Sequence, residues 1–192
     1  MQNFTFHTPT KVFFGKGTEK QVGEIIKSYG FSKVLFHYGS GSIKKSGLYD
    51  VVVASLKENG IDYVELGGVE ANPKLSLARK AAKLAKSEKV DMILAVGGGS
   101  VLDSAKAAAA GAYYDCDPWE FSSKKRAPEK ALPVGTILTL AASGSEMSDS
   151  CVITNEDGWL KRGFNAPSNR PLFSILNPEL TFTVSKYQTG CG

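Results

Sequence analysis

The sequence predicts an α/β fold in which helices cover both faces of a mostly parallel sheet, with a β-hairpin insertion. Short apolar runs alternate with segments of helical periodicity from about residue 18 to residue 112. The apolar runs are nearly continuous, as strands buried on both faces are. A glycine-rich turn, VGGGS (96–100), joins one run to an alanine-rich helix. Repeated β-α units of this kind build a parallel sheet.

Composition limits the class of protein. The 192 residues are 42% hydrophobic, which is enough for a substantial core, and we expect one domain over residues 1–192. Lys and Arg total 23 against 19 Asp and Glu, without long basic runs, so we expect no nucleic-acid partner. Three scattered cysteines favour a reducing cytoplasm over a disulfide framework or a zinc motif. With no leader-like start and no apolar stretch of membrane-span length, the sequence predicts a cytoplasmic protein without a membrane partner.

The first half of the chain reads as strands and helices in turn. Apolar and polar side chains alternate over residues 4–15 on both sides of Pro9, as in two short strands or a hairpin. Residues 18–29 repeat apolar side chains at the spacing of one helical face, and Gly30 follows as a stop. The later elements are expected at 33–39 (strand), 46–58 (helix), 62–68 (strand), 74–88 (helix after Asn72-Pro73), 91–99 (strand) and 102–112 (helix).

The character changes after Asp117-Pro118. A polar loop to about residue 131 leads to a strand, 133–140, and then to a glycine- and serine-rich turn. The runs 151–155 and 159–164 flank Asp157-Gly158, a strong signal for a β-hairpin, so we place the insertion at about 151–164. The run 172–176 returns to the sheet.

The glycine-rich turn that follows the apolar residues 91–96 has the composition of an anion site. Three consecutive glycines remove every Cβ and let an anion approach the backbone, where a helix N-terminus favours negative charge. Ser100 adds a hydroxyl donor. The turn is not the common G-x-G-x-x-G pattern, because Leu102 occupies the last glycine position, and a turn without a ligand is the alternative. Asp103, expected in the first helical turn, is either a helix-start residue or a group that faces a sugar or nicotinamide.

Several segments of the chain resemble the iron-containing alcohol dehydrogenases, in particular their butanol-dehydrogenase-like branch. The matching segments are FGKG (14–17), YGSGSIKKSGLYD (38–50), NP (72–73), AVGGGSVLDSAKA (95–107), DPWEF (117–121), LPVGTILTLAASGSEM (132–147), VITN (152–155) and FSILNPELTF (173–182). The resemblance implies a Rossmann-like fold similar to the N-terminal domain of dehydroquinate synthase and glycerol dehydrogenase. In that fold a dinucleotide-binding domain precedes a helical one.

The same resemblance implies an activity and a site. Members of this family move a hydride between NAD(P)H and a primary alcohol or aldehyde with the help of iron, or sometimes zinc. By position, Gly98, Gly99 and Ser100 would hold the pyrophosphate, and Asp103 would lie near the nicotinamide ribose. Thr139, Leu140 and Ser143 would line the nicotinamide side, with Lys161 reaching the ribose. We also expect a homodimer.

The loop after the strand 33–39 bears on the choice of cofactor. This branch normally has YGGGSIK here, whereas Ser40 replaces the middle glycine in this chain. A carboxylate at such a position would accept the ribose 2′-hydroxyl, and Gly39, Ser40 and Ser42 supply none. Lys44 and Lys45 follow, so we predict NADP(H) over NAD(H), against the alternative that these lysines form a solvated face.

The family's metal ligands, one aspartate and three histidines, are expected beyond the segment SKYQTGCG, so neither metal ligands nor catalytic residues are assigned here. His7 and His37 are interpreted as structural. We expect the helical metal-binding domain to be absent, which would leave an apolar face exposed, and the 192-residue chain alone to be inactive. Truncation is favoured over a chain that works with a second polypeptide.

The sequence is compatible with three functions. The leading one is an alcohol dehydrogenase or aldehyde reductase represented by its cofactor domain. A dinucleotide-binding module without catalysis, and an NAD-dependent lyase of the dehydroquinate synthase type, are the alternatives. The segments DPWEF and LAASGSEM favour the dehydrogenase over the lyase.

Overall fold

The computed structural model describes residues 3, 5 and 7–192. Its strands are β1 (Lys11–Phe14), β2 (Lys33–Gly39), β3 (Asp62–Val69), β4 (Met92–Gly97), β5 (Val134–Leu138), β6 (Ser150–Asn155), β7 (Leu160–Asn165) and β8 (Phe173–Leu176). Its helices are α1 (Val22–Ser28), α2 (Ser42–Lys45), α3 (Leu48–Glu58), α4 (Leu75–Ser87), α5 (Gly99–Tyr114), α6 (Trp119–Ser122) and α7 (Lys186–Cys191). Short 3₁₀ turns occur at η1 (Thr18–Gln21), η2 (Pro167–Asn169) and η3 (Pro178–Thr181).

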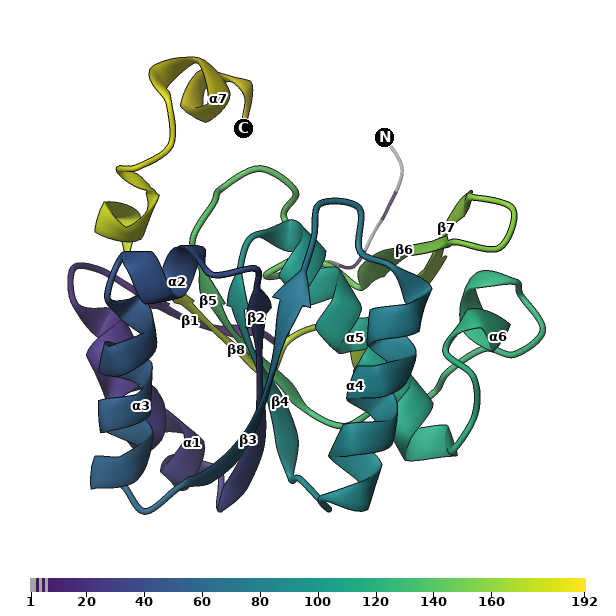
Figure 1. Cartoon of the computed structure of the whole chain (residues 1–192), viewed down its shortest axis with the longest axis horizontal. Helices are drawn as coiled ribbons and strands as arrows, with labels where there is room; N and C mark the ends of the chain where they lie inside the picture. Colours follow the sequence, from purple (N-terminus) through teal and green to yellow (C-terminus); the bar gives the residue numbers. More distant parts are fainter. Residues whose placement is uncertain (1–2, 4, 6) are drawn as a thin grey trace.

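The central sheet is parallel throughout its described length and confirms the predicted fold class. Its strand order is β1-β8-β5-β4-β2-β3. From β2 the chain crosses through α3 to β3 on one face, whereas from β4 it crosses through α5 to β5 on the other face (Figure 1). The direction of winding therefore reverses between the neighbouring strands β2 and β4. In open α/β sheets, ligands bind in the crevice at the carboxyl ends of such strands.

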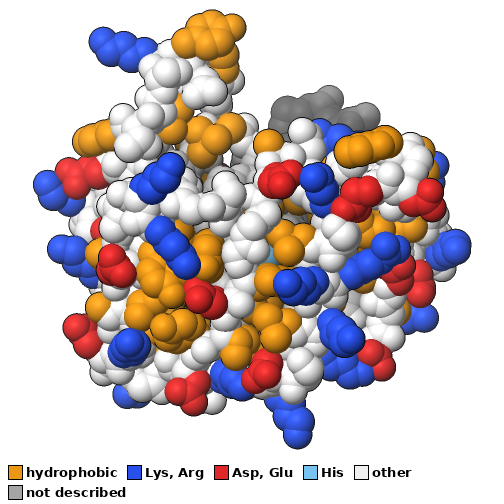
Figure 2. All heavy atoms as spheres, viewed as in Figure 1, with side chains coloured by type: hydrophobic (Ala, Val, Ile, Leu, Met, Phe, Trp, Pro, Cys, Tyr) orange, Lys and Arg blue, Asp and Glu red, His pale blue; other side chains and the backbone are white. Residues whose placement is uncertain are grey.

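Two apolar layers hold the helices to the sheet. One lies under α1 and α3, where Ile26, Val52 and Leu56 pack on Phe36 and Leu94. The other lies under α4 and α5 (Figure 1). On that side α5 presents alanines, so its backbone can approach the strands closely, and the whole predicted alanine-rich segment is helical. Figure 2 shows basic and acidic side chains interspersed over the viewed face, without one large basic surface.

The predicted hairpin forms from β6 and β7, which pair antiparallel as a separate ribbon. Cys151, Ile153 and Phe164 bury one face of the ribbon against Leu75 of α4 and Phe121 of α6. The hairpin is therefore attached to α4, α5 and α6 and lies near the carboxyl ends of the strands (Figure 1).

The structure corrects several boundaries. Phe4 and Phe6 of the expected N-terminal hairpin lie outside the described residues, and β1 pairs parallel with β8 instead of forming a hairpin. Helix α6 interrupts the expected polar loop. Helix α5 begins at Gly99 rather than at residue 102, because the carbonyl of Gly98 already accepts the N–H groups of Val101 and Leu102. In the part of the chain that the structure describes, no helix is long and apolar enough to cross a membrane.

Candidate functional site

A cleft of about 210 Å³ lies at the carboxyl ends of β2, β3, β4 and β5, where the winding of the sheet reverses. Its lining is Gly39, Ser40, Ser42, Val69, Glu70, Ala71, Gly97, Gly98, Gly99, Ser100, Val101, Thr139 and Leu140. The structure thus brings together eight residues that the sequence analysis placed in the site: Gly39, Ser40, Ser42, Gly98, Gly99, Ser100, Thr139 and Leu140. They come from three loops that are far apart in the sequence.

The glycine turn forms the floor of the cleft, and two of its glycines cannot be replaced without moving a neighbour. Gly97 has a φ of 159°, and a Cβ there would lie 2.5 Å from Cγ2 of Val101. A Cβ on Gly99 would collide with Oγ of Ser143. Ser143, another predicted site residue, therefore lies directly against the turn although it does not line the cleft. The sequence could not show this contact, because it joins segments more than forty residues apart.

The turn presents backbone donors to the cleft. Helical geometry leaves the N–H groups of Gly99 and Ser100 without an intrahelical acceptor, while those of Val101 and Leu102 bond to Gly98. The positive end of the α5 dipole adds to these donors. A phosphate group fits such a cradle, and a Cβ on Gly98 would meet Leu140 across the cleft at 3.4 Å.

The opposite rim contains a carboxylate that the sequence analysis missed. Glu70 directly follows β3 and lines the cleft, and its Oε2 lies 2.8 Å from Nζ of Lys74. Its position in the sequence could have indicated this place. Glu70 closely follows the predicted strand 62–68, and the carboxyl ends of neighbouring parallel strands lie on the same side of a sheet. Ser40 and Ser42, where β2 leads into α2, also line the cleft.

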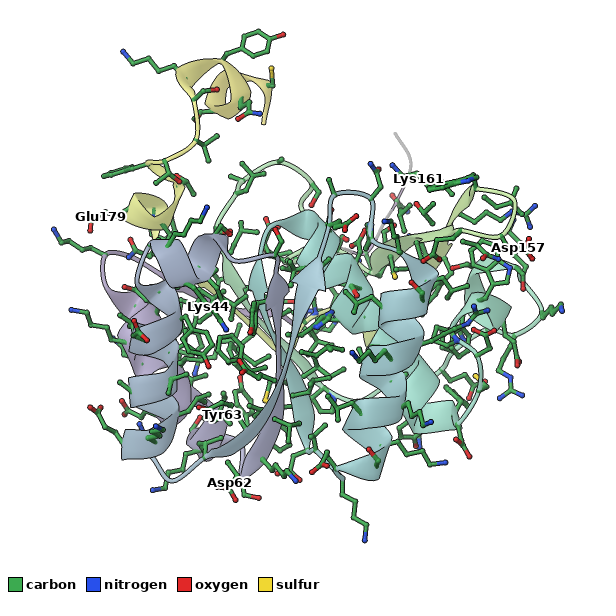
Figure 3. The ribbon with its side chains drawn as sticks, viewed as in Figure 1. Lys44, Asp62, Tyr63, Asp157, Lys161 and Glu179 are labelled. Carbon is green, nitrogen blue, oxygen red and sulfur yellow. The ribbon has the colours of Figure 1, made fainter. Side chains whose placement is uncertain are left out.

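Lys44 lies away from the cleft. Its Nζ is 5.2 Å from the ring centroid of Tyr38 and 4.6 Å from that of Tyr49, on the side of the sheet that α3 covers (Figure 3). The hydroxyls of Tyr38 and Tyr49 both donate to Oε2 of Glu65, at 2.9 and 3.0 Å. A hydrogen bond with Tyr38 raises the pKa of Lys44. Lys44 therefore does not line the cleft, and the preference for NADP(H) stays a prediction.

Asp103 lies in the second turn of α5, not in the first, and both of its carboxylate oxygens have protein partners. Oδ1 accepts from Oγ of Ser145 at 2.7 Å, and Oδ2 accepts from the backbone N–H of Val152 at 3.1 Å. Burial raises the pKa of this carboxyl, against the hydrogen bond from Ser145. Asp103 does not line the cleft but joins α5 to the segment between β5 and β6.

Lys106 is the second residue that the sequence analysis missed. It stands one turn beyond Asp103 in α5 and is fully buried. Burial lowers its pKa, and the charge of Asp103 opposes that change. The signal in the sequence was a lysine at the start of a run of alanines, in a helix expected to pack against the sheet.

Lys161 projects from β7 at the rim of the molecule, apart from Asp157 at the hairpin tip (Figure 3). Its Nζ donates to Oδ1 of Asn72 at 2.7 Å. Asn72 follows Ala71, which lines the cleft, so Lys161 links the hairpin to the edge of the site. It does not line the cleft itself.

No cluster of three His, Cys, Asp or Glu side chains that could hold a metal ion occurs among residues 3, 5 and 7–192. His37 is fully buried: its Nδ1 lies 2.7 Å from the carbonyl of Leu66, and its Nε2 lies 2.9 Å from Oγ of Ser104. The structural interpretation of His37 is confirmed. His7 is exposed.

A sequence model of one protein family, described as iron-containing alcohol dehydrogenase, matches residues 9–178. The chain is 51% identical over 189 residues to probable NADH-dependent butanol dehydrogenase 1 of Bacillus subtilis, with 98% of this chain and 49% of the relative covered. It is 40% identical over 195 aligned positions to the NADPH-dependent aldehyde reductase YqhD of Escherichia coli, with 100% and 49% covered.

Solved structures agree with these sequence matches. The crystal structure of NADH-dependent butanol dehydrogenase A from Thermotoga maritima superimposes with a TM-score of 0.96 at 52% identity, covering 98% of this chain and 48% of that one. The chain therefore spans about half the length of the relatives that it matches.

Proposed function

Because the chain belongs to the iron-containing alcohol dehydrogenase family, we propose that it is the dinucleotide-binding part of an NAD(P)H-dependent alcohol dehydrogenase or aldehyde reductase. The observation that carries this proposal is the triple-glycine turn at the reversal point of the sheet. It offers backbone donors at the N-terminus of α5, inside a cleft where a side chain on Gly99 would collide with Ser143. The family match favours this function over the lyase, and the non-catalytic module remains the alternative that activity measurements test.

Each of the three loops of the cleft binds a different part of the cofactor. Gly98, Gly99 and Ser100 hold the pyrophosphate through backbone N–H groups, a hydroxyl and the helix dipole. The β2–α2 loop, Gly39 to Ser42, holds the adenosine ribose, and Thr139 and Leu140 contact the nicotinamide side. When bound, NAD(P)H supplies the hydride that passes to the carbonyl carbon of an aldehyde.

The substrate class we propose is a small primary alcohol or its aldehyde, because the relatives include a probable butanol dehydrogenase and an aldehyde reductase. The family description implies a metal, but the described residues do not fit a metal site, since they bring no set of ligands together.

We further propose that NADPH binds more tightly than NADH. Because Lys44 lies outside the cleft, the support for this preference comes from other residues. Ser40 and Ser42 offer hydroxyl donors at the rim of the cleft, and the carboxylate of Glu70 is paired with Lys74. Calorimetric titration should give a dissociation constant lower for NADPH by roughly threefold to tenfold, the range for hydrogen bonds to a charged group at a solvated rim. Ser40→Asp should reverse the preference by opposing a 2′-phosphate. Equal affinities in the unchanged chain, or a preference for NADH, would contradict the proposal.

The 192-residue chain alone should not reduce butanal, whatever iron or zinc is added. Polarisation of the carbonyl by a metal is worth several kcal/mol, and three suitable ligands do not meet in the described residues. NADPH consumption measured at 340 nm should stay at background and should appear when a polypeptide of the relatives' length is used. Metal-dependent turnover by the purified chain, free of host dehydrogenases, would refute this assignment of the active site.

A further inference from the structure

The segment between β5 and β6, residues 139–149, forms one wall of the candidate site without being a helix or a strand. Leu140 faces Gly98 across the cleft, and Ser143 lies against Gly99. A wall made of irregular backbone needs partners for its carbonyl groups, because buried carbonyls without hydrogen bonds are costly. The positions of these two side chains therefore depend on whatever holds the segment.

The buried ammonium of Lys106 holds this segment. Its Nζ donates to the carbonyl of Ser145 at 2.7 Å, that of Ser148 at 3.0 Å and that of Ser150 at 2.9 Å. It also lies 2.9 Å from Oγ of Ser145. Three carbonyls and one hydroxyl around a single positive charge resemble the oxygen cage of a bound monovalent cation. Here the cation is covalently attached to α5.

Asp103 completes the arrangement from the same helix. The hydroxyl of Ser145 donates to Oδ1 of Asp103 and lies beside the ammonium of Lys106, so the two opposite charges share one partner. The second oxygen of Asp103 accepts the N–H of Val152. Both charged residues of α5 are thus directed to the segment that leads from the cleft to the hairpin, and neither lines the cleft.

We propose that Lys106 is a positioning residue for dinucleotide binding, which sets the place of Leu140 and Ser143 relative to the glycine turn. Lys106 lies seven residues after Gly99, about 10 Å along the same helix. One rigid element therefore carries the phosphate cradle at its N-terminus and the anchor of the facing wall farther along. Asp103 acts in the same way, through Ser145. This role rests on the proposed function, because it acts on the cleft assigned to the cofactor.

The test is chemical rescue. Lys106→Ala should weaken NADPH binding by about tenfold or more, since a buried charged donor with several acceptors is lost. Propylammonium chloride should restore most of the affinity by entering the vacated space, whereas propanol should not. Lys106→Met fills the same space without a charge and should not respond to the amine. Lys83→Ala, on the exposed side of α4, is the matched control and should bind as the unchanged chain does.

Hydrogen exchange of the peptide covering residues 139–149 gives a second readout that does not need the cofactor. Its protection should fall in Lys106→Ala and return with propylammonium. If Lys106→Ala fails to fold, Ser145→Ala, which removes the shared hydroxyl but keeps the lysine, should weaken NADPH binding several-fold. Unchanged affinity in a folded Lys106→Ala or Ser145→Ala chain, or a loss that the amine does not reverse, would overturn the role of Lys106. Absence of NADPH binding in the unchanged chain would instead contradict the proposed function itself.

Discussion

Buried polar side chains connect the elements around the site, and His37 shows how. The imidazole extends from β2 with no exposed surface, and its two nitrogens contact the carbonyl of Leu66 in β3 and the hydroxyl of Ser104 in α5. These partners assign a neutral ring that donates from Nδ1 and accepts at Nε2. Burial lowers the pKa of His37 to about 4, against the hydrogen bond to Leu66. A protonated ring would lose the acceptor that Ser104 uses.

His37 should make the stability of the chain depend on pH. Its pKa falls from 6.5 to about 4 on folding, so the unfolded chain binds more protons between these values, and stability rises with pH there. The contribution is complete above pH 6.5 and is lost as the pH falls toward 4, by up to about 3 kcal/mol. Urea unfolding of the chain and of His37→Gln from pH 4 to 7.5 measures the difference. Parallel pH profiles would show that His37 does not titrate as its burial requires.

At the scale of elements, α5 can lie close to the sheet because the side chains between them are small. Ala105, Ala108 and Ala109 have no exposed surface and lie against the sheet, and Gly111 allows a close approach of Pro118. A Cβ on Gly111 would lie 2.7 Å from Cγ of Pro118. The small residues thus fix how near the phosphate cradle lies to the strands.

Ala109→Leu should destabilise the chain by about 1–3 kcal/mol, the usual result of adding volume to a packed core. The side chain would enter the layer between α5 and the sheet, where Ala109 is fully buried. Tyr113→Leu, one turn later on the exposed side of the same helix, is the control and should change stability little. Chemical denaturation measures both free energies of unfolding. A variant at residue 109 as stable as the control would mean that this layer is loosely packed.

The elements also show what sequence reasoning can reach. The strand 33–39 was predicted with its observed bounds, and the long helices to within a few residues, because their periodicity is local. Helix α6 was missed because its four residues carry no period, and Phe121 is placed by packing on Phe164. The parallel pairing of β1 with β8 joins the two ends of the chain and leaves no local signal.

In the candidate site, too, the local motifs were predictable from the sequence and the tertiary contacts were not. The glycine turn and the β2–α2 loop are continuous motifs, and the structure brings them together in one cleft. The direction of Lys44, the presence of Glu70 and the contacts of Lys106 arise from tertiary packing. These side-chain positions depend on which strands are neighbours in the sheet. The strand order is set by the tertiary fold and cannot be read from local sequence patterns.

At the scale of the whole molecule, the order of the strands explains why the site lies where it does. After β2 and after β4 the chain turns to opposite faces of the sheet, so the loops that follow these neighbouring strands meet at their carboxyl ends (Figure 1). The C-terminal segment extends away from the sheet on the same side and carries Phe182 and Tyr187, which are 75% and 83% exposed. The candidate cleft and the C-terminal segment thus lie on the same side of the molecule, at the carboxyl ends of the strands.

The most direct test of this account is a titration of NADPH against the 192-residue chain and two variants of Gly98. Gly98 has an ordinary φ of −86°, and an added Cβ would meet Leu140 at a tolerable 3.4 Å. Gly98→Ala should therefore fold and retain weakened binding, whereas the branched side chain of Gly98→Val should fill the cleft and abolish binding with the fold intact by circular dichroism. The account predicts one NADPH per chain for the unchanged sequence and none for folded Gly98→Val. Equal NADPH affinity in the unchanged chain and in folded Gly98→Val would contradict it.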